Sequence, residues 1–291
     1  MFPPTAFLIG AQKSATTTLA HLLDRHPRVI VSNPKEPNYF TRHRDRDLGW
    51  YRQRFPENID GAVLLDATPS YSAAPLPGHD PPDRVCDPKS PLAGVPKRIR
   101  TVCPDARFIY LTRDPVMRTY SSYWHRVRTG EEVLPFRAAI DHDSFYLRTS
   151  DYAGQIKLYL AEFPIDRFLF LTMEQLIADP TATCRRCFQF LEVPDADFEA
   201  PPEKSHKNKS YRFSRTGRMV FGLAGSFSAF RKLTTVGKKV LPRSIRNLAA
   251  RWLTRSIPPI SKRDQDHLRN FFREKNGEFA RLTGLNIDHW S

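Results

Sequence analysis

A short apolar run that leads into a tight loop and then into a helix opens the sequence and constrains its fold more than any other feature. Residues 5–10 read TAFLIG, which is typical of a short buried strand. Residues 16–25 then place Leu19, Leu22 and Leu23 on one helical face. Similar apolar runs at residues 62–65, 107–111 and 167–171 alternate with helical stretches, which we predict at residues 115–129, 145–163 and 262–282. This alternation predicts an α/β fold with a central, mainly parallel sheet flanked by helices.

Two stretches depart from this alternation. Residues 74–96 contain seven prolines within 23 residues, which excludes regular structure and predicts a long surface loop. Residues 217–257 alternate apolar and basic side chains in a helical manner, broken by Pro242. We expect one domain over residues 1–291, with residues 204–263 forming a basic helical lid.

The positive charge of the chain is concentrated in that lid. The formal net charge is +14, and residues 204–263 alone carry 16 Lys or Arg and no Asp or Glu. Such a block could contact nucleic acid, an anionic membrane, an acidic substrate or a phosphate-rich cofactor. A nucleic-acid-binding module is therefore an alternative, although the block contains no recognised nucleic-acid motif and few aromatic side chains for stacking.

The N-terminal segment, the length of the apolar stretches and the cysteines indicate the cellular compartment. No basic segment precedes the first apolar run, and no stretch of 18 apolar residues occurs. We expect a cytoplasmic protein without a transmembrane segment, with peripheral contact at a membrane as an alternative. Cys184 and Cys187 form a C-x-x-C pair that could suggest zinc, but the other two cysteines are 17 residues apart and the pair lies in a helical pattern. We interpret them as buried thiols.

The loop after the first strand has the composition of a phosphate-binding loop. It reads GAQKSATTT over residues 10–18, with one lysine, several hydroxyls and the backbone N–H groups of a helix N-terminus. It is not the nucleotide triphosphatase version, because Lys13 follows Gly10 by only three residues and a second glycine is missing. A solvated Lys13 is the alternative.

A second strand ends on an arginine at RFIYLTRDPVMRTYSSYWH, residues 107–125. Arg113 lies where open α/β sheets bind ligands, and Ser121 can face the same anion from the following helix. The alternative is a structural Arg113–Asp114 ion pair beside an ordinary surface serine.

Together these motifs resemble the sulfotransferases that use 3′-phosphoadenosine 5′-phosphosulfate (PAPS), especially the carbohydrate branch related to heparan sulfate enzymes. GAQKSATTTL with HPRVIVSNPKEPNYF is similar to the 5′-phosphosulfate loop, and RFIYLTRDPVMRTYSSYWH to the 3′-phosphate motif. LLDATPSY, DYAGQIKLYLAEFP, FLFLTMEQLIADP and FFREKNGEFARLTGLNIDHW extend the resemblance over nearly the whole chain. It implies a P-loop-like three-layer fold.

The resemblance also implies site residues. Lys13 would contact the 5′-phosphosulfate, and Arg113 and Ser121 the 3′-phosphate. Glu36, in the segment KEPNYF, would be the catalytic base, and Lys35 beside it could lower the pKa of Glu36 or bind the sulfate. Further donors to the 5′-phosphosulfate would be Ser14, Ala15, Thr16, Thr17 and Thr18. The basic loop at residues 204–212 would add cofactor contacts from Lys207, Asn208, Lys209 and Tyr211.

In-line transfer of a sulfuryl group needs a base and a cation at the leaving oxygen, and no metal is required. The sequence departs from the heparan-type pattern at Asp66-Ala67, where those enzymes often carry Glu-Lys, and Ala15 replaces a usual glycine.

A glycan or glycolipid is the expected acceptor, at a hydroxyl or amine, with a small phenolic or natural-product acceptor as the alternative. A P-loop kinase is a further alternative, because Asp66 at the end of an apolar strand resembles a magnesium ligand.

Overall fold

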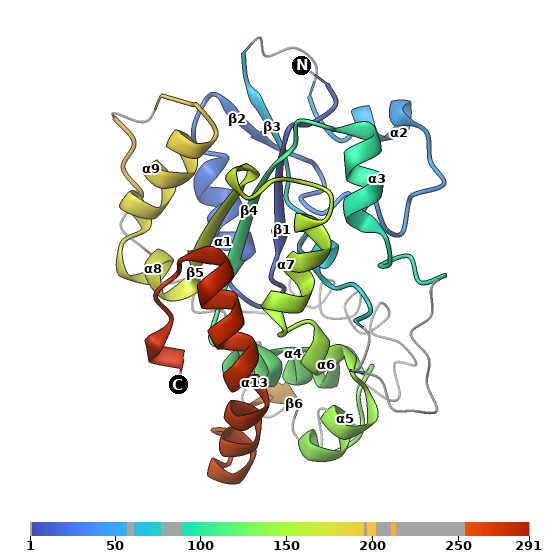
Figure 1. The fold of residues 1–291 in the computed structure, drawn as a ribbon, viewed down its shortest axis with the longest axis vertical. Coiled ribbons are helices and arrows are strands. Elements are labelled where there is room, and N and C mark those ends of the chain that lie inside the picture. Colours follow the sequence, from blue (N-terminus) through green and yellow to red (C-terminus); the bar gives the residue numbers. More distant parts are fainter. Residues whose placement is uncertain are drawn as a thin grey trace, which may run out of the picture.

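The computed structural model describes residues 2–56, 61–76, 79, 89–194, 197–201, 211–213 and 254–290. Five parallel strands form the central sheet in the order β2-β3-β1-β4-β5 (Figure 1). The strands are β1 (Ala6–Gly10), β2 (Val29–Val31), β3 (Val63–Asp66), β4 (Arg107–Thr112) and β5 (Phe168–Thr172). The predicted α/β class is confirmed.

Helices connect the strands and cover both faces of the sheet (Figure 1). They are α1 (Thr16–Leu23), α2 (Leu48–Arg52), α3 (Val95–Val102), α4 (Pro115–Thr129), α5 (Phe136–His142), α6 (Phe145–Arg148), α7 (Tyr152–Leu160), α8 (Met173–Ala178), α9 (Pro180–Phe190) and α13 (Lys262–Thr283), with short 3₁₀ turns η1 (Pro69–Ser72), η2 (Ile165–Arg167) and η3 (Asp288–Trp290). Within the described residues, no helix is both long and apolar enough to cross a membrane.

The alternation of side chains along the strands divides the core into two layers. Phe7 and Phe108 belong to the cluster that includes α3, α7 and the end of α13. Leu8 and Ile109, one residue further along each strand, belong to the cluster that includes α1, α8 and α9. Because successive side chains of a strand point to opposite faces, both faces of the sheet are buried, and the predicted three-layer arrangement is confirmed.

The strand order fixes where a ligand can bind. From β1 the chain passes through α1 to β2 on one side of the sheet, whereas from β4 it passes to β5 on the other side. The topological switch point therefore lies at the carboxyl ends of β1 and β4, the position at which open α/β sheets bind ligands. Residues 11–15 and Arg113 follow these two strands directly.

Three sequence predictions need correction, and one strand was missed. The helix predicted at residues 145–163 is two helices, α6 and α7, because Asp151 caps α7 by accepting a hydrogen bond from the Gly154 N–H. The stretch predicted without regular structure ends where α3 begins at Val95, with its proline in the first turn. The helical stretch predicted to residue 257 contains a strand, β7 (Thr254–Ser256), which pairs antiparallel with β6 (Tyr211–Phe213). Strand β2 was not predicted, since three residues show no periodicity.

Candidate functional site

The loop between β1 and α1 has a strained backbone. Lys13 and Ala15 adopt positive φ angles of 71° and 64°, a left-handed conformation that glycine adopts more easily than other residues. The Ala11 N–H donates to the Leu111 carbonyl at 2.6 Å, which ties the start of the loop to β4. The "usual glycine" of the resemblance therefore has a physical reason at Ala15, since that position lies in the left-handed region.

Residues 14–18 differ in how they face the surface. Ser14 is fully buried, its N–H donates to the Ala11 carbonyl, and its hydroxyl lies beside that of Tyr152. Thr17 is exposed, Ala15 and Thr18 are half-buried, and Thr16 is nearly buried at the first position of α1. The first N–H groups of a helix have no intrahelical acceptor, so this turn can donate to an anion.

Positive charge gathers around this loop from the neighbouring α4. Burial is the main reason that the pKa of Lys13 falls to about 8, and the charges of Arg128, Arg118 and Arg113 lower it further. Arg113 Nη1 donates to the Lys13 carbonyl at 3.3 Å. Glu36 is the group that raises the Lys13 pKa, so its carboxylate also acts at this ammonium group. The cations thus outnumber the acid, which favours binding of a multivalent anion.

Arg118 holds the loop from behind. Its side chain is fully buried and donates from Nε to the Gln12 carbonyl at 3.1 Å, and from Nη1 to the Tyr146 carbonyl and to the hydroxyls of Thr149 and Ser150. Burial lowers the pKa of Arg118 to about 10. Sequence reasoning missed this residue, because three of its partners lie about 30 residues further along the chain, in α6 and in the break after it, a stretch that was predicted as continuous helix.

The face of α4 that meets the loop carries further candidates. Ser121, His125 and Arg128 follow Arg118 at helical spacings of three and four, so all four lie on one side of the helix. Burial, followed by the charges of Lys13 and Arg128, lowers the pKa of His125 to about 4, which keeps the imidazole neutral near pH 7. The predicted residue Ser121 is half-buried between these charged positions.

Asp114 has a different partner from the one that the ion-pair alternative requires. Its carboxylate caps α4 by accepting the N–H groups of Val116 at 2.8 Å and Met117 at 3.4 Å. Arg113, half-buried at the end of β4, points its guanidinium to the Lys13 carbonyl instead. The geometry therefore favours the anion-binding interpretation of Arg113.

Residues 35–40, which we call the base segment, carry the candidate base. Glu36 is exposed, with 42% of its side-chain surface accessible, and accepts a hydrogen bond from Lys35 Nζ at 3.1 Å. Lys35 Nζ also donates to the Ala67 carbonyl at 3.1 Å. Lys35 thus links Glu36 to the end of β3, and Glu36 lies within the electrostatic reach of Lys13.

Asp66 at the end of β3 is fully buried and accepts three hydroxyl hydrogen bonds. Its donors are Thr68 at 2.6 Å, Tyr51 at 2.7 Å and Tyr71 at 2.9 Å. Both carboxylate oxygens are engaged by protein hydroxyls, an arrangement unlike that of an exposed magnesium ligand. The feature that suggested a P-loop kinase is therefore part of the core.

The remaining predicted residues are less informative. Lys207, Asn208 and Lys209 lie outside the described residues, and for Tyr211 the structure gives only its place in β6. Cys184 and Cys187 are free and fully buried in α9, as predicted, and burial raises the pKa of Cys184 to about 12, so a thiol and not a metal-binding thiolate is favoured.

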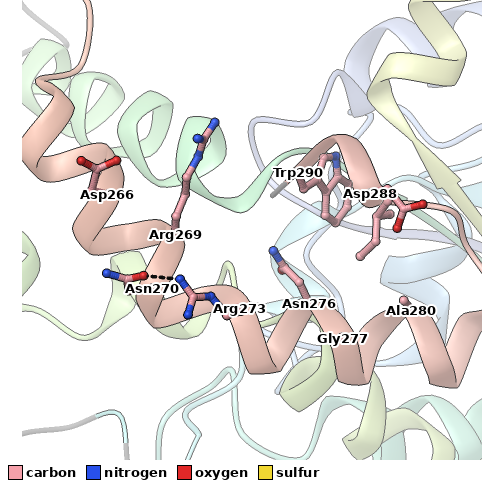
Figure 2. Close-up of a pocket in the computed structure, with 10 residues that line it drawn as sticks. Asp266, Arg269, Asn270, Arg273, Asn276, Gly277, Ala280, Asp288 and Trp290 are labelled. Carbon is pink, nitrogen blue, oxygen red and sulfur yellow. Dashed lines mark hydrogen bonds between the residues drawn. The ribbon is translucent and has the colours of Figure 1, made fainter.

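A separate cavity of about 570 Å³ lies along α13 (Figure 2). Arg269 and Arg273 project from the helix, and the Trp290 ring lies opposite them. None of the residues that line it belongs to the loop, to α4 or to the base segment. The candidate site described above is therefore separate from this cavity and lies at the carboxyl ends of β1, β3 and β4.

A family model described as the sulfotransferase family matches residues 4–197. The chain belongs to this family. The chain is 25% identical over 290 residues to mouse heparan sulfate glucosamine 3-O-sulfotransferase 3A1, an alignment that covers 97% of this chain and 63% of the relative. It is 30% identical over 196 residues to human heparan sulfate glucosamine 3-O-sulfotransferase 6, which covers 65% of this chain and 52% of the relative. The chain thus spans less than two thirds of the length of the mouse relative.

A solved structure supports the fold. The crystal structure of a sulfotransferase from Alicyclobacillus acidocaldarius aligns with a TM-score of 0.67 and 20% identity, and the alignment covers 100% of this chain and 99% of that chain. At this identity the likeness shows the fold alone.

Proposed function

We propose that the chain transfers a sulfuryl group from PAPS to a hydroxyl or amine of an acceptor, with a glycan or glycolipid as the acceptor class. The observation that carries this proposal is the group of cations around Lys13: after burial, the charges of Arg128, Arg118 and Arg113 lower its pKa, and Glu36 is the acid named against them. The donor is a multivalent anion, so the charge of the loop fits it. When bound, PAPS supplies the sulfuryl group and a nucleotide leaving group.

Each part of the site has a role in this proposal. Lys13 and the first N–H groups of α1 bind the 5′ end of the donor, and Lys13 stabilises the negative charge that develops there. Arg113 and Ser121 bind the 3′-phosphate from the end of β4 and from α4. Glu36 removes the proton of the acceptor, and its exposure leaves it accessible to an incoming hydroxyl or amine.

The acceptor class rests on the names of the relatives, which are heparan sulfate glucosamine 3-O-sulfotransferases. A difference in this chain concerns the position after Asp66, where Ala67 has no charged side chain. The nearby cation is instead Lys35, whose Nζ contacts the Ala67 carbonyl. We infer that Lys35 supplies, from the base segment, the positive charge that heparan-type enzymes often carry at the position of Ala67.

Calorimetry with the product nucleotide, 3′-phosphoadenosine 5′-phosphate, tests the donor site. We expect tight binding without magnesium, weakened about 10- to 100-fold in Lys13→Ala and in Arg113→Ala, the range for loss of a charge-assisted hydrogen bond. Lys97→Ala, which removes an exposed cation from α3, is the matched control and should bind normally. A clear preference for ATP with magnesium would overturn the proposal.

An acceptor screen with Glu36→Gln then tests the base. We expect the transfer rate to fall about 10²- to 10⁴-fold while nucleotide affinity stays within twofold, because removal of a general base affects the chemical step. Full transfer by Glu36→Gln would show that another group takes the proton.

A further inference from the structure

Four hydrogen bonds hold the base segment against residues 66–71, which we call the platform. Lys35 Nζ donates to the Ala67 carbonyl at 3.1 Å, the Asn38 N–H to Thr68 Oγ1 at 3.4 Å, Ser70 Oγ to Asn38 Oδ1 at 3.0 Å, and the Phe40 N–H to the Tyr71 hydroxyl at 3.3 Å. The two segments lie about 30 residues apart in the sequence. The position of Glu36 therefore depends on the platform as well as on its own neighbours.

The two bonds to backbone N–H groups need hydroxyl oxygens that act as acceptors. A hydroxyl has one hydrogen, and its direction decides which side of the oxygen can accept. The Thr68 hydroxyl donates its hydrogen to Asp66 Oδ1 at 2.6 Å, and the Tyr71 hydroxyl donates to Asp66 Oδ2 at 2.9 Å. Their lone pairs are thereby left for the N–H groups of Asn38 and Phe40.

The backbone that these bonds hold is an unfavourable one. Asn38 has a positive φ of 55°, and its side-chain amide donates to the Glu36 carbonyl at 2.8 Å. A left-handed residue persists where surrounding contacts fix it. The platform bonds at Asn38 and Phe40 support this left-handed bend, which leaves Glu36 within the electrostatic reach of Lys13.

We propose that Asp66 is the positioning residue for the catalytic base: it orients the hydroxyls of Thr68 and Tyr71 so that they accept the N–H groups of the base segment and hold Glu36 at Lys13. The role of Glu36 in this statement rests on the function proposed above. The positioning itself rests on the hydrogen bonds alone, and can be measured without turnover.

The charge state of Asp66 follows from the same contacts. An ionised carboxylate only accepts hydrogen bonds, whereas a protonated one must donate its own hydrogen and would displace one of the three hydroxyls. Burial raises the pKa of Asp66 to about 6, and the three hydroxyls and Lys35 lower it, so the acid is ionised near pH 7. Cys103 and Tyr159 also face it, and both are neutral at that pH.

Two tyrosines supply a matched pair for the test. Tyr51 and Tyr71 both donate to Asp66 Oδ2, but the structure records a bond to the base segment for the Tyr71 hydroxyl. We expect Tyr71→Phe to increase hydrogen exchange at the Phe40 amide about 10-fold and to lower kcat by a similar factor, the effect of one lost hydrogen bond. Product-nucleotide affinity should stay within twofold, and Tyr51→Phe should leave the exchange at Phe40 unchanged.

Thr68 supplies a second pair. Thr68→Val removes the hydroxyl and keeps the shape, so it should increase exchange at the Asn38 amide and lower kcat, and Thr68→Ser should restore both. Asp66→Asn should increase exchange at Asn38 and Phe40 together.

The two proposals fail in different ways. If Asp66→Asn, Thr68→Val and Tyr71→Phe leave exchange in the base segment unchanged, or if both tyrosine variants change it equally, the positioning role is wrong. If exchange responds as expected but Glu36→Gln keeps full activity, the positioning role stands and the assignment of the base fails.

Discussion

Two loops that follow adjacent strands of the same sheet differ in their charge, their backbone conformation and their hydrogen bonding. The loop after β1 (residues 10–18) gathers cations with few acids, and two of its residues, Lys13 and Ala15, have positive φ angles. The platform after β3 contains no positive φ over residues 66–71, and its buried acid accepts three hydroxyl hydrogen bonds. Around Lys13 the first loop has three arginines against one glutamate, whereas the buried acid of the platform is satisfied by hydroxyls of the protein itself.

The difference shows how a site can be divided between binding and support. Charge without a partner raises the free energy of the folded state, and that energy is recovered when a ligand of opposite charge binds. A satisfied buried network holds its neighbours in one geometry, and any change in it leaves polar groups unpaired. We therefore expect substitutions in the loop after β1 to affect ligand binding more than stability, and substitutions in the platform to affect stability more than ligand binding.

The largest expected effect is the contrast in stability between Asp66→Ala and Lys13→Ala. Asp66→Ala leaves three buried hydroxyls without their acceptor and should lower the free energy of unfolding by about 3 kcal/mol or more. Lys13→Ala removes a cation whose pKa is depressed by burial and by three arginines, so stability should stay the same or rise. Urea unfolding at pH 7 measures both, and equal losses would show that the two loops do not differ as described.

The pH dependence of stability sharpens the same contrast. The pKa of Asp66 is about 6 in the folded state against a usual value of 3.8, so between these values the folded protein binds more protons than the unfolded chain. Asp66 therefore costs stability as pH rises through this window, by about 2 kcal/mol between pH 4 and pH 7. Asp66→Asn has no carboxyl group to titrate at this position. The difference in unfolding free energy between this variant and the unchanged protein should therefore change by that amount between pH 4 and pH 7. A constant difference would show that the Asp66 pKa is not raised.

How far the sequence predicts this arrangement differs between the loops. The residues 10–18 and 107–125 were found because a strand, a loop and a helix are contiguous in the chain, and their cations stand at element boundaries. The Asp66 network was not found, since Tyr51, Thr68 and Tyr71 become partners through the packing of α2 and η1 on β3. Arg118 was missed for the same reason: its acceptors lie about 30 residues away.

A smaller expected effect is the uptake of a proton by Lys13, in the loop after β1, when 3′-phosphoadenosine 5′-phosphate binds. Because the pKa of Lys13 is about 8, about half of the molecules carry a neutral amine at pH 8. A bound anion favours the ammonium form, so binding of 3′-phosphoadenosine 5′-phosphate at this pH should take up about half a proton per site. Calorimetry in buffers of different ionisation enthalpy measures this number. Lys13→Arg keeps the charge and should show no uptake; uptake of the same size in that variant would assign the proton elsewhere.

The smallest expected effect compares the same substitution in both loops. Ala15 has a φ of 64° at the start of α1, where glycine avoids the strain of a side chain, so Ala15→Gly should raise the unfolding free energy by about 0.5 kcal/mol. Ala67 is fully buried in the platform and has no positive φ, so Ala67→Gly should lower it by about 1 kcal/mol, through the greater freedom of glycine in the unfolded chain and the loss of a buried methyl. Thermal unfolding of the two variants reports the sign directly. Opposite signs are required if the loop after β1 is strained at Ala15 and the platform is not strained at Ala67. A loss of stability in both variants would mean that the Ala15 methyl contributes more through packing than its backbone conformation costs.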